Sequence, residues 1–343
     1  MLQVKQLHRA SPVLFTLPTV ITLLCFAGSA SAQGYDDAFE MKNKLKVELQ
    51  YADYGEYEYP EPIVYHYGVT TYQQIQPFIV NFPELRGLVK FVRLLDGKTA
   101  LGIKYQFSDL KKDASQHFGE LRITHNLSES VIGLASTQFV RDTRGFNSFQ
   151  VGAGGLWDIN ALTSVQGDVQ YYARGSEATA VGGSMGTWNF RVKARRVLTL
   201  STAVQGEYIY YNASGDAISF RSHTAGIWLS QYLPTETAVH LHFRYYTNSM
   251  GIRSIAPSLE IAQYLNWATV LSLKLRYYEN KSDNVSLGES DVIIPNGLRS
   301  RSVSVQLNHE LGRAVLAYAK YRYYTSSLSV QMNTYMIGAI YSF

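Results

Sequence analysis

The sequence predicts an all-β fold, a closed antiparallel transmembrane β-barrel of about 16 strands, within a range of roughly 14 to 18. Three observations support this prediction. Apolar and polar residues alternate with a period of two through most of the chain after residue 32, which is the pattern of strands. No stretch there approaches the roughly 18 apolar residues of a membrane-spanning helix. Tyrosine is abundant, at 26 residues, and many of these tyrosines close an alternating segment.

Residues 1–32 have the three parts of a cleavable signal peptide. Lys5 and Arg9 provide a basic start, and residues 12–26 form an apolar core. Residues 30–32 read Ala-Ser-Ala, which is a small-residue cleavage site. We therefore expect the chain to be exported and the leader to be removed.

The remaining residues, 33–343, are expected to form a single barrel domain. Cys25 is the only cysteine, so the processed chain would hold no thiol for a disulfide, a metal site or a nucleophile. The formal net charge of +4 is too small to indicate nucleic-acid binding. We therefore expect no metal, no cofactor and no nucleic-acid partner.

The alternation and the turn residues between the alternating segments predict the position of each strand. Rising strands are expected at 44–52, 99–108, 130–140, 162–173, 199–211, 237–247, 268–279 and 314–325. Falling strands are expected at 115–125, 146–157, 186–197, 219–232, 253–264, 299–311 and 329–343. One more falling strand is expected within 76–94, where two prolines and a glycine obscure the pattern.

Five of the predicted strands end in a pair of adjacent tyrosines. One ring of each pair is expected on the lipid side near a rim, because amphipathic rings favour the membrane interface. Tyrosines also favour strands in general, but recurrence at strand ends favours an aromatic girdle. The predicted girdle residues are Tyr171, Tyr210, Tyr245, Tyr277 and Tyr323, with Phe343 at the opposite rim.

The last strand carries a resemblance to a known group of proteins. Residues 335–343 read YMIGAIYSF, with aromatic or apolar residues at every second position and Phe343 at the end. This resembles the terminal signature of Gram-negative outer-membrane β-barrels. The RYY triplets at 244–246 and 276–278 also resemble those of uncharacterised outer-membrane barrel families. The resemblance implies location in the cell outer membrane, contact with its lipid, and recognition by the barrel-insertion machinery through the last strand.

The polar faces of the predicted strands would line the lumen. The cations placed there are Lys46, Lys104, Arg122, Arg191, Lys193, Arg195, Arg244, Lys274, Arg276, Lys320 and Arg322. The acids placed there are Glu48, Glu120, Asp168, Glu207 and Glu260. Cations thus outnumber acids by about two to one, which favours anions in a pore. In the alternative interpretation these charges pair across strands and only keep the lumen wet.

These features predict a porin-like channel that passes small polar or anionic solutes through a net-basic lumen. The alternative is an export or assembly conduit for an anionic polymer such as an exopolysaccharide, which implies periplasmic export partners. A related variant is a barrel that sheathes an electron-transfer partner. The acidic, aromatic segment 54–72 is either a surface loop or an inward constriction.

Enzymatic chemistry is not expected. His240 and His242 share a strand face and could hold a metal ion with Glu207 or Glu260. Two histidines beside an arginine more often line a polar lumen. The pair at 222–223, Ser-His, has no acid partner marked by the sequence. The sequence therefore predicts a transport protein rather than an enzyme.

Overall fold

The structure is a computed structural model in which the described residues form one closed β-wall and a small separate hairpin. The predicted signal peptide and most of segment 54–72 lie outside the described residues. No helix in the described part of the chain is long and apolar enough to cross a membrane. The described residues are 39, 41–54, 64–66, 69–71, 83–110, 114–143, 146–176, 185–215, 219–249, 251–282, 297–327 and 330–343.

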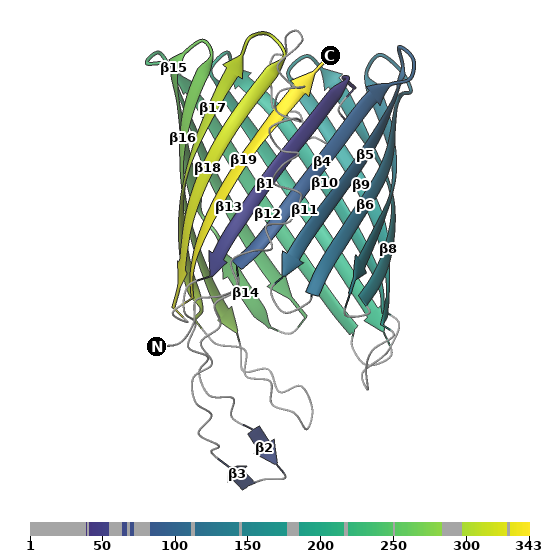
Figure 1. Ribbon diagram of the computed structural model, residues 1–343, viewed down its shortest axis with the longest axis vertical. Coiled ribbons are helices and arrows are strands. Elements are labelled where there is room, and N and C mark those ends of the chain that lie inside the picture. Colours follow the sequence, from purple (N-terminus) through teal and green to yellow (C-terminus); the bar gives the residue numbers. More distant parts are fainter. Residues whose placement is uncertain are drawn as a thin grey trace, which may run out of the picture.

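The strands follow the sequence in order around the wall (Figure 1). The first half comprises β1 (Lys44–Tyr54), β4 (Pro83–Leu94), β5 (Thr99–Leu110), β6 (Ala114–Asn126), β7 (Val131–Asp142), β8 (Phe146–Asn160), β9 (Thr163–Ser176) and β10 (Met185–Thr199). The second half comprises β11 (Thr202–Gly215), β12 (Ser219–Leu233), β13 (Thr237–Asn248), β14 (Ile252–Ile255), β15 (Ser258–Asn266), β16 (Thr269–Ser282), β17 (Arg299–Leu311), β18 (Val315–Ser326) and β19 (Gln331–Ser342). The separate hairpin pairs β2 (Val64–His66) with β3 (Val69–Thr71).

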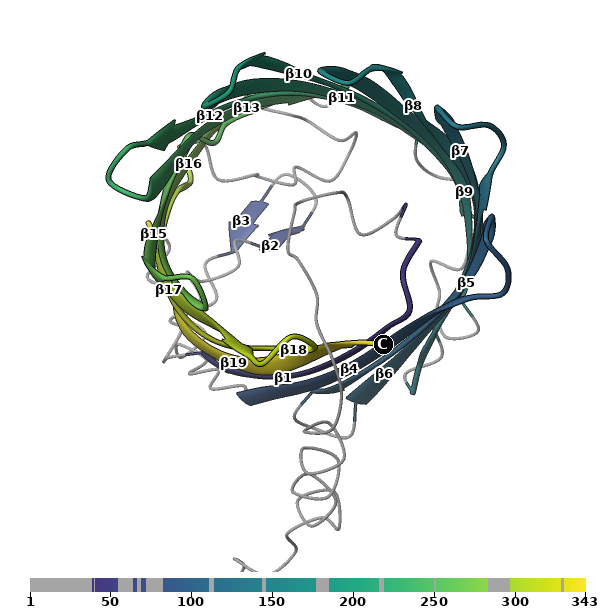
Figure 2. The same cartoon turned by 90° about the horizontal axis from the view of Figure 1, so that it is seen from above.

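The wall closes at β1, which pairs antiparallel with β19 on one side and with β4 on the other (Figure 2). β14 and β15 together occupy one position in the ring, so the described residues form a closed antiparallel barrel of sixteen strands. This confirms the predicted fold class. All sixteen predicted segments coincide with strands of the wall, and the unplaced segment within 76–94 contains β4, which begins at Pro83. Proline is tolerated at the first residue of a strand, where its missing donor costs least.

One predicted strand, 253–264, is interrupted in the middle. β13 pairs Tyr245 with Ile255 before the break and His242 with Ser258 after it, so the register continues unchanged. Pro257 lies at the break and has no N–H to donate. Its carbonyl still accepts a hydrogen bond from the backbone N–H of Tyr277 (3.0 Å). The interruption is therefore one missing donor rather than an opening in the wall.

The two ends of the barrel differ. At one end, which we call the turn end, the strands are joined by residues 95–98, 127–130, 161–162, 200–201, 234–236, 267–268 and 312–314. At the other, the loop end, the connections include the two longest ones, 55–82 and 283–298. β1 begins and β19 ends at the turn end, which is uppermost in Figure 1. Outer-membrane barrels have short periplasmic turns and longer extracellular loops, so the loop end is expected to face outward.

Tight turns are stabilised locally by side chains and by special backbone conformations. In the turn after β4, the Asp96 carboxylate accepts hydrogen bonds from the backbone N–H groups of Lys98 (2.7 Å) and Thr99 (2.6 Å). The hydrogen bond from Lys98 is the main cause that holds the pKa of Asp96 below its ordinary value. Gly312, in the turn before β18, has a φ of 71°, a conformation that glycine adopts without strain.

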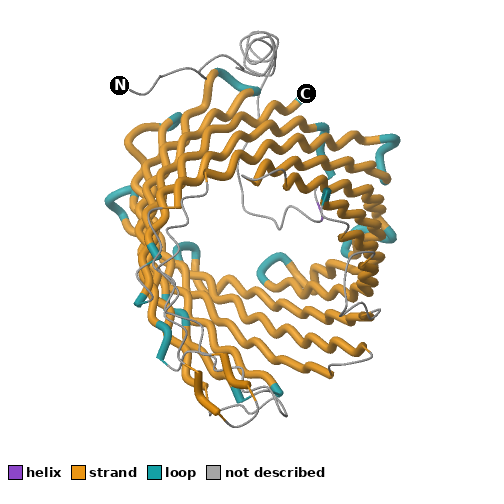
Figure 3. The backbone as a smooth tube through the Cα atoms, turned by 60° about the horizontal axis from the view of Figure 1, so that its bottom comes forward, coloured by secondary structure: helices purple, strands orange, loops and turns teal. Residues whose placement is uncertain are grey.

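The wall has an outer and an inner face with opposite chemistry. The strands cross it obliquely (Figure 3), and residues two apart share a face. On the outer face the apolar side chains are exposed, as with Leu241 (50%) and Phe243 (45%). On the inner face small polar side chains are crowded by the concave wall and become buried, as with Ser222 (6%) and Thr224 (5%). An exposed apolar belt around a polar interior is the arrangement that lipid outside and water inside require.

The closing strands are also joined on the inner face. The Tyr318 hydroxyl on β18 donates a hydrogen bond to the Glu48 carboxylate on β1, reaching across β19. Gly338 of β19 is the register partner of both residues and lies between them. A Cβ added at Gly338 would overlap the Tyr318 ring. The absence of a side chain at this position therefore lets the ring lie against the wall.

This contact predicts that Gly338→Val weakens the closure of the barrel. The added side chain displaces the Tyr318 ring and removes its hydrogen bond to a charged partner, so we expect the free energy of unfolding to fall by about 2 kcal/mol or more. Thermal unfolding in detergent, followed by the gel-mobility difference between folded and unfolded barrel, measures this. Gly206→Val is the matched control, because a Cβ at Gly206 meets nothing within 4 Å. Equal loss of stability in both variants would contradict the role of Gly338.

Candidate functional site

The RYY triplets place an arginine and two tyrosines on β13, β16 and β18. Because side chains alternate along a strand, the arginine and the second tyrosine share the inner face while the first tyrosine lies on the outer face. The pairing of Arg276 with Ser258 and of Tyr278 with Ser300 fits this placement. Each triplet thus places an arginine and, two residues later, a tyrosine ring on the inner face. Its three copies are residues 244–246, 276–278 and 322–324.

These arginines belong to a group of inner-face cations that we call the basic wall. It is defined by Arg244 on β13, Arg276 on β16, and Lys320 and Arg322 on β18. Arg276 lies within electrostatic range of Arg244 and Arg322, and Lys320 within range of Arg322. The strands between them contribute small inner-face residues, including Ser258, Ser302 and Ser304. The Arg276 side chain is exposed, and those of the other three cations are half-buried.

The acids Glu260 and Glu48 lie within electrostatic range of Lys320 in the basic wall, but neither forms an ion pair with it. Within the described part of the chain, none of its four cations forms an ion pair with a carboxylate. Lys274, on β16 beside them, is paired with Glu260 on β15 at 2.8 Å. The buried Nε of Arg322 has no hydrogen-bond partner. Like charges held together raise the free energy of the empty site, so the basic wall favours a bound or passing anion.

The rest of the inner wall is different, because five of its cations form ion pairs with carboxylates. Four ion pairs lie on β1, β6 and β9 to β11, strands that follow the bottom, right and top of the ring in Figure 2. Together with Glu84–Arg86 on β4 (2.7 Å), they neutralise five cations on this side. The four are Lys46–Glu48 (3.1 Å), Glu120–Arg122, Asp168–Arg191 (2.7 Å) and Glu207–Lys193 (3.7 Å). Two of these five pairs join neighbouring strands and three join residues of one strand. Ion pairs therefore neutralise cations on one side of the lumen, whereas the basic wall on the other side forms no ion pair among the described residues.

The strand register places every predicted lumen cation on the inner face. Besides the basic wall and the paired residues, these include Lys104, whose Nζ lies 4.8 Å from the centre of the Phe118 ring, and Arg195 opposite Gln205. The register also places the predicted girdle tyrosines on the outer face: Tyr171, Tyr210, Tyr245, Tyr277 and Tyr323. Phe343, just after β19, is exposed and stacks on Phe91 and Tyr341.

Among the residues whose side chains the structure describes, three inner-face cations were not predicted from the sequence. Arg86 and Lys90 lie on β4, and Lys44 begins β1. The prolines and glycine near β4 prevented an assignment of its faces from the sequence alone. The pairing of Lys46 with Lys90 and of Lys90 with Lys104 fixes the face. The sequence feature that could have revealed the inner face of β4 is the alternation of Glu84 and Arg86 with apolar neighbours.

The second tyrosines of the pairs form an inner aromatic series near the loop end. They alternate around the ring with small or polar residues on the falling strands. Tyr172 faces Thr187, and Tyr246 faces Thr224 and Ser254. These small residues are buried, with Thr187 only 1% exposed, as expected beside large rings. The inner series comprises Tyr172, Tyr211, Tyr246, Tyr278 and Tyr324.

The histidines and serine weighed for catalysis make other contacts. His242 stacks on the Trp228 indole at 3.9 Å between ring centres and 5° between planes. His240 Nδ1 lies 2.8 Å from the Ser230 hydroxyl. The described residues contain no group of three or more side chains able to hold a metal ion.

The pair formed by Ser222 and His223 cannot act as a dyad. The two side chains lie on opposite faces of β12, because they are adjacent in a strand. His223 Nδ1 lies 2.7 Å from the hydroxyl of Tyr208 on the outer face.

No protein-family model matches the sequence, and no curated protein matches it. Solved structures share its fold. The structure named "Bacterial polysaccharide outer membrane secretin" has a TM-score of 0.58 and 9% identity, over 89% of this chain and 100% of that one. CdiB from Acinetobacter baumannii has a TM-score of 0.57 and 11% identity, over 87% of this chain and 60% of that one. OprD from Pseudomonas aeruginosa has a TM-score of 0.47 and 7% identity, over 92% of this chain and 98% of that one.

The first two likenesses show a shared fold and nothing finer at these identities, and the third is too weak to add to them. The closed antiparallel wall, the exposed apolar outer face and the polar inner face together define the class of the protein. It is a transmembrane β-barrel of the cell outer membrane.

The position of Trp228 gives a direct test of the basic wall. Its stacking partner His242 lies within electrostatic range of Arg244 and Arg276. In a variant that keeps only this tryptophan (Trp157→Phe, Trp188→Phe and Trp267→Phe), we expect iodide to quench its fluorescence several-fold more than caesium does, because a positive potential concentrates anions.

Adding Arg244→Gln and Arg276→Gln should bring the two quenching constants close to equality. The control adds Asp168→Asn and Arg191→Gln, which removes an ion pair without changing net charge, and should preserve the difference. Stronger quenching by caesium than by iodide before these changes would contradict the assignment.

Proposed function

We propose that the protein is a porin-like channel that passes small anionic solutes across the outer membrane. The observation that carries this proposal is the basic wall, four inner-face cations without a carboxylate partner in the described part of the chain. Cations lining a water-filled pore lower the energy of an anion there and raise that of a cation. A barrel of about sixteen strands is of the size that leaves an aqueous channel.

The same geometry supports a passive role rather than catalysis. The candidate histidines are stacked or hydrogen-bonded to neutral neighbours, and Ser222 and His223 lie on opposite faces of their strand. The neutralised side of the lumen is polar and would be wetted without binding a particular ion. We therefore assign the protein to transport and attribute charge preference to one side of its wall.

Ion selectivity in a planar bilayer tests this proposal. Under a salt gradient across a single channel, we expect a reversal potential of the sign for preferred anion flow. The variant Arg244→Gln, Arg276→Gln, Lys320→Gln and Arg322→Gln should lower the anion-to-cation permeability ratio several-fold, because it removes the uncompensated charges.

The control for this measurement is Asp168→Asn with Arg191→Gln, which should leave the permeability ratio unchanged because one positive and one negative charge are lost together. Cation preference in the wild-type channel, or the absence of conductance at all voltages, would contradict the proposal.

A second candidate function is a conduit for an anionic polysaccharide, and the inner tyrosine series favours it. Sugar rings present apolar faces that pack on aromatic rings, while their carboxylates pair with arginine. The RYY triplets place both groups two residues apart on the same face, as with Arg322, whose guanidinium carbon lies 5.9 Å from the centre of the Tyr324 ring. The structure of similar fold that is named as a polysaccharide secretin fits this candidate but shares only the fold.

Current block by oligosaccharides separates the two candidates. If the channel is a conduit, alginate oligomers should block it for longer than neutral dextrans of equal length. Tyr246→Ala, Tyr278→Ala and Tyr324→Ala together should then shorten the block by about threefold or more, because stacking contacts are lost. The control is Tyr245→Ala with Tyr323→Ala, since these rings lie on the outer face. Equal block by alginate and dextran would exclude the conduit and leave the channel proposal standing.

A further inference from the structure

A second group of cations lies on the outer face of the barrel, at the loop end of three neighbouring strands. We call it the rim cluster, and it consists of Arg253 on β14, Lys281 on β16, and Arg299 and Arg301 on β17. All four side chains are exposed. The strand register sets Arg253 directly opposite Lys281, so the cluster is continuous across the strands.

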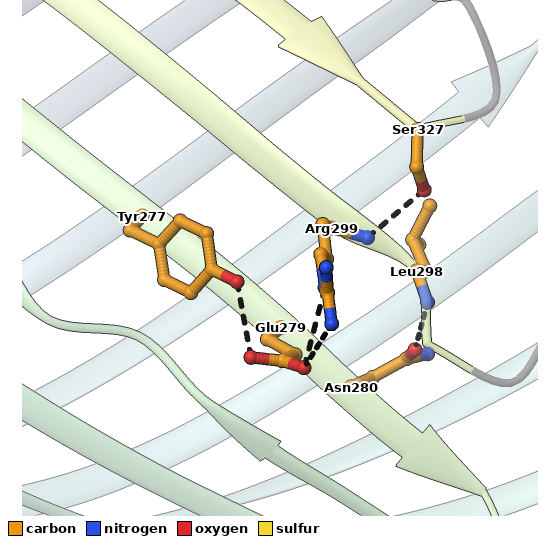
Figure 4. Close-up of polar contacts among 6 residues, drawn as sticks. All are labelled: Tyr277, Glu279, Asn280, Leu298, Arg299 and Ser327. Carbon is orange, nitrogen blue, oxygen red and sulfur yellow. Dashed lines mark hydrogen bonds and ion pairs between the residues drawn. The ribbon is translucent and has the colours of Figure 1, made fainter.

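One carboxylate organises the centre of this cluster (Figure 4). Glu279 is the register partner of Arg299, and its Oε1 accepts hydrogen bonds from the Nε and a terminal nitrogen of that arginine, both at 3.3 Å. The Tyr277 hydroxyl donates to Oε2 of the same carboxylate at 3.0 Å. Arg301 lies opposite Tyr277. Glu279 therefore orients one arginine, and among the described residues Lys281 and Arg301 form no ion pair.

The backbone beneath the cluster is fixed at the start of β17. The N–H of Arg299 donates to the Ser327 hydroxyl (3.0 Å), and the N–H of Leu298 donates to the Asn280 side chain (2.7 Å). Asn280 is itself buried, at 5% exposed. These bonds tie β16, β17 and the end of β18 together. The cations of the rim cluster thus project from a part of the wall whose backbone is held in place by these hydrogen bonds.

The rim cluster lies where the apolar belt ends. Along the outer face of β16, the residues toward the middle of the wall are Leu275, Leu273 and Leu271, all exposed. Tyr277 separates them from Glu279 and Lys281, and tyrosine favours the level of the lipid head groups. Side chains just beyond it are therefore at the depth where phosphates of anionic lipids lie.

The cluster is local rather than a property of the whole rim. Among the described outer-face residues at the loop end, other cations stand singly, as Arg141 on β7 and Arg221 on β12. At the same level β1 and β5 present acids, Asp53 and Asp109. Lys281 and Arg301 lie on either side of the Arg299–Glu279 ion pair along neighbouring strands. Holding like charges near one another costs free energy, and a bound anion offsets that cost.

We propose that the rim cluster binds the phosphate group of an anionic lipid in the leaflet that surrounds the loop end. Arginine forks suit phosphate oxygens, and Lys281 supplies a further point charge. The acyl chains of such a lipid would lie along the exposed leucines of β16 and valines of β17. This inference concerns the outer face and does not depend on what passes through the lumen.

The test uses the purified full-length barrel in neutral detergent and native mass spectrometry with diphosphoryl lipid A. We expect lipid A to remain bound to the wild-type protein and its dephosphorylated form to be retained far less. Lys281→Gln with Arg301→Gln should reduce the bound fraction by about tenfold or more. This variant keeps the contacts among Tyr277, Glu279 and Arg299, and the gel-mobility shift of the folded barrel verifies its fold.

The control variant is Arg141→Gln with Arg221→Gln, which removes two isolated cations from the same rim and should bind lipid A like the wild type. Inorganic phosphate provides a further arm and should not displace the lipid at equal concentration. The proposal is overturned if the dephosphorylated lipid binds equally well, if free phosphate competes fully, or if both variants retain lipid A to the same extent.

Discussion

Backbone hydrogen bonding in a medium without water is the constraint on which the whole structure depends. Every N–H and C=O group at membrane depth must find a partner within the protein, and a sheet can achieve this only as a ring without edges. β1 completes that ring because it pairs with β19 and β4. The tolerated exception, Pro257, removes one donor and leaves the register on both sides unchanged. The tyrosine bond across Gly338 adds a side-chain connection where the ring closes.

Once the ring is closed, alternation gives each strand one side in lipid and one side in the lumen. Because of this alternation, each of the three RYY triplets contributes to both faces of the wall. Its first tyrosine lies on the outer face, and its arginine and second tyrosine lie on the inner face. The inner face then divides into a neutralised side and the basic wall. The division matters for function because a fully paired lumen would be wet without a charge preference, whereas uncompensated cations bias the ions that enter. Neighbouring side chains on the concave inner face bury small residues such as Thr187.

The sequence alone was sufficient for the strands and the faces of their side chains, because a period of two is a local property that tertiary contacts do not alter. For β4 it predicted a strand within 76–94 but neither its bounds nor its faces, because Pro83 and Gly87 break the pattern. It also left open which cations are paired, since a bridge such as Asp168–Arg191 joins strands whose register only the fold sets. The rim cluster was missed for the same reason. Its members come from three strands, and only their pairing brings Arg253 beside Lys281. The predicted signal peptide and most of segment 54–72 stay predictions, because they lie outside the described residues.

The central claim is that hydrocarbon surrounds one face of these strands and water the other, and β16 is the place to measure it. The processed chain is expected to lack cysteine, so Leu271→Cys, Ser272→Cys, Leu273→Cys and Lys274→Cys can each be made singly and reconstituted in liposomes. A water-soluble, membrane-impermeant thiol reagent should label Ser272→Cys and Lys274→Cys and spare the two leucine positions. Uniform labelling of all four, or labelling of the leucine positions alone, would contradict the account.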